Sequence, residues 1–473
     1  MKNLLLSVIG CFLFSFSTAQ SQTIDEATHL LDVWLDAQKD YNDWPSLSVS
    51  FIHDQDLIYA KSVGHANPNK IIKATPDTLY RIASLSKLFT SISIMQLRDA
   101  GKLNLNDPVQ KHLKWYGIKQ KYPLSDDVTI AGLLTHSSGL PRELDTPYWS
   151  YRRGYPFPDL DELIAVSSKQ ETLYRAWDRY QYSNLAFMLL GQVVATASNM
   201  DYHEYVLENV LKPMKLTNTF SDIDKSKHGK ELAIGYGALN RNRDRMEVPF
   251  IDAKATASAA GFSSSAKDLA KFAMWQLKLL HGNGDDVLDQ NSLREMMRPH
   301  SVTANLDNAV GYGFQLYNRD GKKYIGHSGG FMGFQSHYLI EPDQKIGAVA
   351  LMSGHSTSPH QLVRRVMAIL GPVINNPKVY NPPVALEDYQ GIYDQQPWGD
   401  EIYVTPWGNH LASFNLDTDN PAEAITKLQH VSGDNFARVR KDGTLAELTK
   451  FIRDENGVII SFINQGDEIV KKN

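Results

Sequence analysis

Apolar residues recur along this chain with two periods, which predict where its helices and strands lie. Apolar residues three and four positions apart predict helices at 26–41, 84–100, 185–199, 201–211 and 266–280. Alternation of apolar and polar residues predicts strands at 47–53, 57–63, 323–327, 335–340 and 346–352. Since strands lie near both ends and helices lie between them, we expect the two end segments to share one sheet. The predicted fold class is α/β (α+β), an antiparallel sheet flanked by helices with an inserted helical region.

The C-terminal part of the chain has a different composition. Four prolines fall within the fourteen residues 371–384, which predicts a stiff Pro-rich linker. Short alternating segments separated by turn residues then follow at 401–405, 410–414, 436–439, 448–453 and 458–463. This rhythm is typical of a small antiparallel barrel or sandwich, which we place at 385–473.

The first residues have the pattern of a secretory signal. Lys2 supplies the positive end, 4–16 the apolar stretch and Ser17-Thr18-Ala19 a small-residue cleavage site. The apolar run is short for the alternative, a transmembrane anchor. A lipoprotein processing site at Cys11 is disfavoured because the apolar stretch continues past it. We therefore predict a signal peptide at 1–19, export to the periplasm or the outside, and a main domain at 24–370.

Composition narrows the function further. The chain has 473 residues, is 42% hydrophobic and 21% charged, and carries a formal net charge of −5, so no basic excess suggests nucleic-acid binding. Its single cysteine, Cys11, lies within the predicted signal, so the mature chain would have neither disulfides nor a catalytic thiol. The histidines show no metal-ligand spacing, and we expect no metal and no cofactor.

One lysine stands among apolar residues and needs an explanation. Ser84 and Lys87 are three residues apart in a predicted helix and so share one face. A buried lysine loses proton affinity through desolvation and can then act as a base toward a neighbouring hydroxyl. The plainer interpretation is a helix-capping serine beside a lysine that extends to solvent. S-x-x-K alone does not separate the two.

Two further stretches carry groups suited to the same chemistry. Tyr182 and Asn184 stand two apart before an apolar helix, so in extended chain they point to one side. The sequence His327-Ser328-Gly329-Gly330 follows a predicted strand, and its glycines would let a substrate backbone lie close. The N–H groups of Ser84 and Gly330 would form an oxyanion hole. Taken singly, each stretch also fits ordinary packing or a glycine-rich turn.

Together these stretches resemble the penicillin-recognising serine hydrolases, nearest to the class C β-lactamases and their esterase and D-peptidase relatives. Five phrases occur in the family's order across 24–370, namely IASLSK, LLTHSSGLP, YQYSNLAFMLLG, AAGFSSSAKDLAKF and GHSGG. The resemblance implies the serine β-lactamase/DD-peptidase-like fold, with Ser84 as nucleophile, Lys87 as its partner and Tyr182 as general acid/base. It also implies a substrate-amide contact for Asn184. We interpret His136 as structural support and Ser183 as filler.

The third motif departs from the β-lactamases proper. By resemblance His327, Ser328 and Gly329 line the acyl site, but those enzymes usually carry a lysine where this chain has His327. A lysine offers a permanent positive charge, whereas histidine is mostly neutral at pH 7. We therefore expect a peptidase or esterase acting on small or D-amino-acid-containing substrates. The alternatives are a class C-type β-lactamase and, in another class, a non-catalytic penicillin- or peptidoglycan-binding receptor.

The tail resembles the lipocalin-like domain appended to some of these hydrolases. The resemblance rests on Tyr389-Gln390-Gly391-Ile392-Tyr393 and on the strand rhythm after it. Such a domain would shape the substrate entrance, mediate homo-oligomer assembly or simply stabilise the enzyme. Lipid binding by the barrel alone is a further alternative. The expected partners are a small-molecule or peptide substrate and a second copy of the chain, with no nucleic acid and no membrane span after signal cleavage.

Overall fold

The computed structural model describes residues 14–282, 287–303, 308–355, 358–378 and 380–472. The chain forms two compact units, one of Trp44–Val363 and the other of Met1–Asp43 with Arg364–Asn473. Most of the predicted signal, residues 1–13, lies outside the described residues. The signal peptide therefore stays a prediction. No helix in the described ranges is long and apolar enough to cross a membrane.

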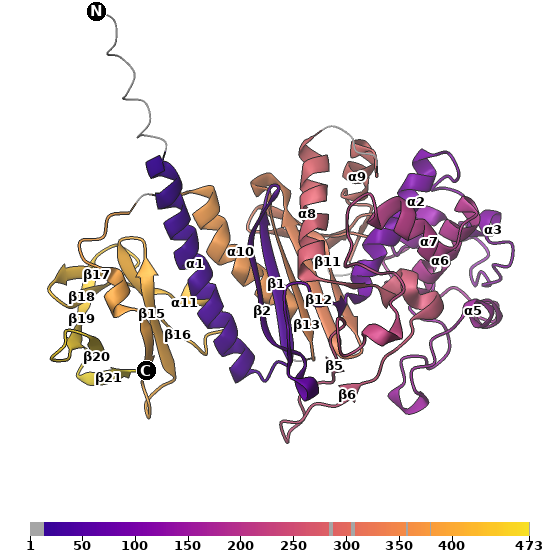
Figure 1. Ribbon diagram of the computed structural model, residues 1–473. Coiled ribbons are helices and arrows are strands. Elements are labelled where there is room, and N and C mark those ends of the chain that lie inside the picture. The colour runs from indigo at the N-terminus through magenta and orange to yellow at the C-terminus, as the bar shows by residue number, and fades with distance from the viewer. Residues whose placement is uncertain (1–13, 283–286, 304–307, 356–357, 379, 473) are drawn as a thin grey trace, which may run out of the picture. The chain divides into compact units, whose positions relative to one another are not determined.

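A nine-stranded antiparallel sheet organises the unit Trp44–Val363 (Figure 1). Its order is β3 (Ile72–Lys73), β2 (Asp56–Asn67), β1 (Ser46–His53), β13 (Ile346–Ser353), β12 (Phe334–Glu341), β11 (Lys322–Phe331), β10 (Gln315–Arg319), β9 (Asn308–Val310) and β8 (Ser301–Val302). β1 pairs with β13 in register Ser46↔Ser353, so the two end segments share one sheet. The predicted fold is thereby confirmed.

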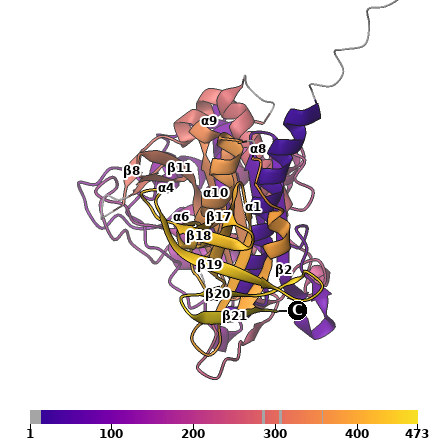
Figure 2. The same ribbon diagram turned by 90° about the vertical axis from the view of Figure 1, so that its left-hand side faces the viewer.

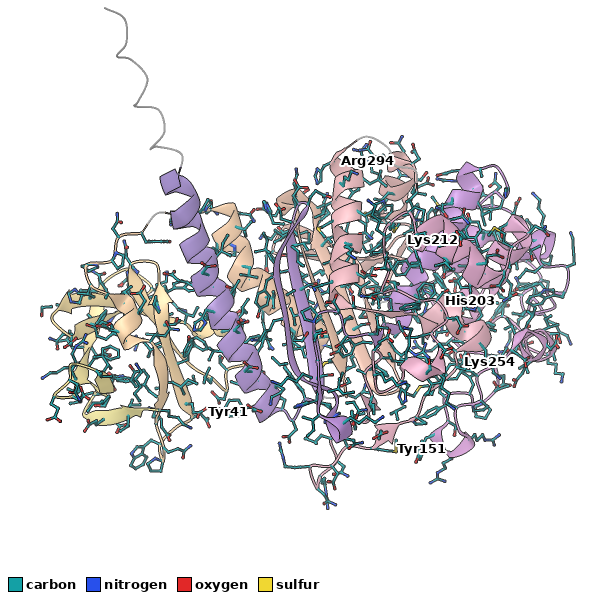
Figure 3. The ribbon with its side chains drawn as sticks, viewed as in Figure 1. Tyr41, Tyr151, His203, Lys212, Lys254 and Arg294 are labelled. Carbon is teal, nitrogen blue, oxygen red and sulfur yellow. The ribbon has the colours of Figure 1, made fainter. Side chains whose placement is uncertain are left out.

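Helices cover the sheet and form the inserted region. They are α2 (Ser86–Asp99), α3 (Val109–His112), α4 (Ile130–Leu134), α5 (Leu160–Ser167), α6 (Asn184–Ser198), α7 (Tyr202–Val206), α8 (Ala266–His281) and α9 (Gln290–Met296). A further helix, α10 (Pro359–Asn375), begins in this unit and continues into the other. α8 runs along one face of the sheet over β1 and β13 (Figure 1). Its apolar side is buried there, as the spacing of its apolar residues predicted. Charged side chains such as Lys212, Lys254 and Arg294 lie exposed on the outside of the helical region (Figure 3).

The C-terminal strands close into a barrel of eight, which decides between the predicted barrel and sandwich. They are β14 (Gly391–Asp394), β15 (Glu401–Trp407), β16 (His410–Asn415), β17 (Thr426–Ser432), β18 (Asn435–Val439), β19 (Leu445–Arg453), β20 (Ile459–Asn464) and β21 (Asp467–Lys471). β14 pairs with β21 to close the ring, and β17 to β21 lie side by side in Figure 2. The sequence did not predict β14, β17 and β21, which are short or mostly exposed and so lack a clear apolar alternation.

The N-terminal helix α1 (Phe14–Tyr41) belongs to the same compact unit as the barrel. Trp34 donates its indole N–H to the carbonyl oxygen of Thr418 at 3.0 Å, and Gln38 donates to that of Leu416 at 2.8 Å. The compact units therefore divide the chain at other places than the predicted domain boundaries, which stay predictions. α10 also continues to Asn375, into the residues where we expected the linker to begin.

Strand β11 passes close to the turn that precedes α2. A Cβ at Gly329 would collide with the carbonyl oxygen of Ile82 and the hydroxyl of Ser336. A Cβ at Gly330 would meet nothing within 4 Å. Gly329 therefore serves the packing of the protein itself, whereas a side chain at Gly330 would enter open space. This corrects the expectation that both glycines make room for a substrate.

The cap of α8 offers a stability test. Ser265, the N-cap of α8, is buried and accepts a hydrogen bond from the N–H of Asp268 at 3.2 Å. We expect Ser265→Ala to lower the free energy of unfolding by about 1 kcal/mol, since the cap bond is lost. Ser263→Ala is the control, because the buried Ser263 hydroxyl has no partner within the described ranges. Urea denaturation of the full chain gives both values, and equal losses would contradict the capping role.

The two glycines of β11 give a second test. We expect Gly329→Ala to destabilise the protein by about 2 kcal/mol or more, because the new methyl overpacks a backbone contact. Gly330→Ala adds the same methyl to open space and should change the stability by less than about 0.5 kcal/mol. Thermal unfolding monitored by circular dichroism compares the two variants. Similar melting temperatures would show that β11 does not press on the 82–83 backbone.

Candidate active site

Ser84 lies in a single turn, Ala83–Leu85, directly before α2. Ala83 has φ +53°, a left-handed conformation that costs a residue with a Cβ about 1 kcal/mol. Ser86 holds this turn by donating its hydroxyl to the carbonyl oxygen of Ala83 at 2.6 Å. The hydroxyl of Ser336, on β12, donates to the carbonyl oxygen of Ile82 at 2.7 Å. The position of Ser84 is thus fixed by contacts from both sides of the turn.

Lys87 is completely buried, and its Nζ has three neighbours within hydrogen-bonding distance. The carbonyl oxygen of Ala259 lies at 2.7 Å and Oδ1 of Asn184 at 2.8 Å, and both are acceptors only. Oγ of Ser84 lies farther away, at 3.3 Å. A neutral amine has two N–H donors and one lone pair. The two acceptors take the donors, and the lone pair is left facing the Ser84 hydroxyl.

Tyr182 approaches Ser84 from the segment before α6. Its hydroxyl donates to Oγ of Ser84 at 2.8 Å. Its ring lies 4.3 Å, centroid to centroid, from the ring of His136, whose Nδ1 accepts the backbone N–H of Ser183 at 3.1 Å. His136 thus supports the tyrosine and does not contact Ser84. Ser183 is more than filler: its hydroxyl caps α6 by accepting the N–H of Ala186 at 2.9 Å.

The side-chain amide of Asn184 is occupied by protein groups at both ends. Its Oδ1 accepts from Lys87, and its Nδ2 donates to Oε1 of Glu143 at 2.7 Å. Because a carboxylate only accepts, Glu143 fixes the orientation of this amide. Tyr148 donates its hydroxyl to the other oxygen of Glu143. In this arrangement Asn184 positions Lys87, and the substrate-amide contact that the resemblance implied stays a prediction.

β11 forms the wall opposite Tyr182. The side chain of His327 is 2% exposed, and its Nδ1–H donates to the carbonyl oxygen of Ser328 at 2.6 Å. A cavity of about 520 Å³ opens between the two walls. It is lined by Ser84, Arg142, Tyr180, Tyr182, Gln315, His327, Ser328, Gly329, Gly330, Gln335, Ser336, Ser358, Pro359 and His360.

Burial sets the protonation of the groups around Ser84. It holds the pKa of Lys87 well below its usual value, while the Glu143 carboxylate raises that pKa and the Arg142 guanidinium lowers it. Burial likewise raises the pKa of Tyr182 far above 10. Burial and the nearby Lys87 lower the pKa of His327 to about 3. At neutral pH the site therefore holds a neutral tyrosine, a neutral His327 and an amine poised to accept a proton.

The structure brings together all eight residues that the sequence singled out. Six of them line the cavity, and the other two, Lys87 and Asn184, are hydrogen-bonded to each other, with Nζ of Lys87 3.3 Å from Oγ of Ser84. Sequence reasoning missed Arg142 and Glu143. Their only signal was a charged pair directly after Gly139-Leu140-Pro141 in a phrase of the family. In the described part of the chain no three His, Cys, Asp or Glu side chains gather as a metal site.

Such an arrangement suits acyl transfer. A hydroxyl that donates to a neutral amine and accepts from a phenol can be deprotonated as it attacks a carbonyl. The phenol is then placed to give a proton to a leaving group. The cavity in front of Ser84 is large enough to admit a small acyl compound or peptide.

The chain is similar in sequence to known proteins. The Beta-lactamase family model matches residues 33–371. "Protein flp" of Staphylococcus aureus (strain MRSA252) is 28% identical over 325 residues, which are 68% of this chain and 62% of that protein. The chain thus spans less than two thirds of the length of this relative.

Solved structures share the fold. An octameric penicillin-binding protein homologue from Pyrococcus abyssi superimposes with a TM-score of 0.64 at 23% identity, covering 94% of this chain and 99% of that one. A D-stereospecific amidohydrolase from Streptomyces sp. superimposes with a TM-score of 0.59 at 21% identity, covering 71% and 97%. Since the family model spans more than half of the sequence, this chain belongs to the Beta-lactamase family of hydrolases.

Proposed function

We propose that this protein is an exported serine hydrolase that cleaves amide or ester bonds through an acyl-enzyme on Ser84. The observation that carries the proposal is the position of Oγ of Ser84, 3.3 Å from Nζ of Lys87 and 2.8 Å from the hydroxyl of Tyr182. Export is included because the pattern of 1–19 is that of a secretory signal.

In the acylation step Lys87 takes the proton of Ser84 while Oγ attacks the carbonyl carbon. The backbone N–H groups of Ser84 and Gly330, which both border the cavity, stabilise the oxyanion. Tyr182 then gives its proton to the leaving amine or alcohol, and the Lys87 ammonium restores the proton of the tyrosine. Water releases the acyl group by the reverse sequence. We assign Lys87 as the base because burial lowers its pKa, whereas burial raises the pKa of Tyr182.

The substrate class follows from the walls of the cavity. His327 is neutral at pH 7, so it does not supply the permanent charge that the corresponding lysine gives a β-lactamase. We therefore favour a peptidase or esterase acting on small or D-amino-acid-containing substrates. The fold shared with a D-stereospecific amidohydrolase is in keeping with this choice. A class C-type β-lactamase remains the second candidate, and a non-catalytic receptor the third.

We extend the proposal to assembly. A penicillin-binding protein homologue of the same fold is octameric, and its similarity covers 94% of this chain, the C-terminal barrel included. A homo-oligomer formed through the barrel is our expectation, and sedimentation of the purified chain measures it.

The first test is covalent labelling of the mature protein. We expect a fluorophosphonate to add one label per chain, because the Ser84 hydroxyl is activated by Lys87. Ser84→Ala should abolish the label, and Lys87→Ala should slow it by about a hundredfold or more. Ser93→Ala is the control, because Ser93 lies in the same helix and donates only to the carbonyl oxygen of Phe89.

Intact-mass spectrometry reads the label, and penicillin in a parallel reaction separates the candidates. A long-lived penicilloyl adduct favours a D-peptidase-like site, and rapid regeneration of free enzyme favours a β-lactamase. Absence of any Ser84-dependent label would overturn the hydrolase and favour the receptor.

The second test uses the pH dependence of kcat/KM. Activity requires neutral Lys87, so the rate falls as the pH drops through its pKa. The charged groups around Lys87 are Glu143 and Arg142, since His136, His327 and Tyr182 are neutral there. Glu143→Gln removes the charge that raises this pKa, and we expect the acidic limb to move to lower pH. Arg142→Gln should move it higher. Shifts in the same direction would refute Lys87 as the base.

A further inference from the structure

Arg142 is the one permanently charged side chain among the described residues that line the cavity. The same described lining contains no aspartate or glutamate, and His327 is neutral. The opposite wall, formed by β11, therefore offers hydrogen-bonding groups but no cation. Any anionic part of a bound molecule finds its only counter-charge at Arg142.

The backbone of Arg142 is held firmly. Its carbonyl oxygen accepts the N–H of Asn184 at 2.8 Å and that of Leu185 at 3.2 Å, at the beginning of α6. These two hydrogen bonds join the loop that contains Arg142 to helix α6, which contains Asn184. The arginine therefore keeps its place relative to Tyr182 and Lys87.

The guanidinium is oriented as well. Its central carbon lies 4.9 Å from the centroid of the Tyr182 ring, and its Nε lies 3.2 Å from Oε1 of Glu143. The Tyr182 ring thus lies against one face of the guanidinium, and the Glu143 carboxylate lies at its Nε edge. For Nη1 and Nη2 no hydrogen bond is found within the described residues, and the side chain is 60% exposed. The fork of the guanidinium is left available beside the tyrosine that contacts Ser84.

We propose that Arg142 is the carboxylate-binding site of this cavity and selects acyl compounds that carry a carboxylate near the scissile bond. The planar fork of a guanidinium matches a carboxylate with two parallel hydrogen bonds. Arg142, beside Tyr182, would then provide the positive charge for a substrate carboxylate. The neutral His327 on β11 does not provide it. The proposal rests on the hydrolase function proposed above and names the substrate class of the same site.

The test compares esters that differ only in charge. One pair, mono-p-nitrophenyl succinate and its methyl ester, places the carboxylate on the acyl part. The other pair, 3-acetoxybenzoate and its methyl ester, places it on the leaving group. We expect the wild-type enzyme to prefer the charged member of at least one pair in kcat/KM. Arg142→Gln should reduce that preference about tenfold, chiefly through KM, and Arg142→Lys should restore part of it.

The ratio of kcat/KM for the charged ester to that for the neutral ester separates recognition of the carboxylate from other roles of Arg142. Arg142 also affects the pKa of Lys87, but that effect changes both members of a pair equally and cancels in the ratio. Arg153→Gln is the control, because it removes the same charge from an exposed position outside the cavity lining. An unchanged ratio in Arg142→Gln for both pairs would overturn the proposal while leaving the hydrolase intact.

A binding measurement keeps the proposal testable without turnover. In the Ser84→Ala protein, monomethyl succinate should bind about tenfold more tightly than dimethyl succinate, as measured by calorimetric titration, and the added Arg142→Gln change should remove the difference. Equal affinities of the two compounds would overturn the carboxylate site. If the esters are not hydrolysed in a Ser84-dependent way, the hydrolase proposal fails, and this titration still decides the role of Arg142.

Discussion

The burial of Lys87 is the constraint on which the rest of this site depends. An ammonium group without water is costly, so burial lowers the pKa of Lys87, and its N–H groups must find acceptors. The acceptors come from α6, through Asn184, and from the carbonyl oxygen of Ala259. Three segments distant in sequence must therefore be fixed against one another before the lone pair of Lys87 can face Ser84.

A second feature is the way one short loop sets both the structure and the charge of the site. The carbonyl oxygen of Arg142 accepts the first two N–H groups of α6, and the Glu143 carboxylate orients the side-chain amide of Asn184. Their opposite charges act on the same amine, one raising and one lowering its pKa. A positional shift of this loop would therefore change the hydrogen bonds of Lys87 and its proton affinity together.

The two walls of the cavity differ in kind. β11 contributes glycines and a neutral histidine, and it lies against the 82–83 backbone because Gly329 has no side chain. The wall that carries Tyr182 contributes aromatic rings and one guanidinium. Among the described lining residues the permanent cation lies beside the tyrosine and not on β11, which distinguishes this cavity from one in which the third motif carries a lysine.

Local sequence determined much of this molecule. The apolar periods located the main helices and strands because burying one face requires them. The spacing of Ser84 and Lys87 predicted that the two side chains would lie close together, although Ser84 lies in the turn before α2, and the fold class followed from the order of the elements. The barrel strands β14, β17 and β21 escaped detection, since pairing with neighbours rather than an apolar pattern makes them strands. Only the tertiary structure decided that Lys87 meets Ala259, 172 residues away, and that Glu143 orients Asn184. These contacts depend on how whole elements pack, and no local period in the sequence encodes that packing.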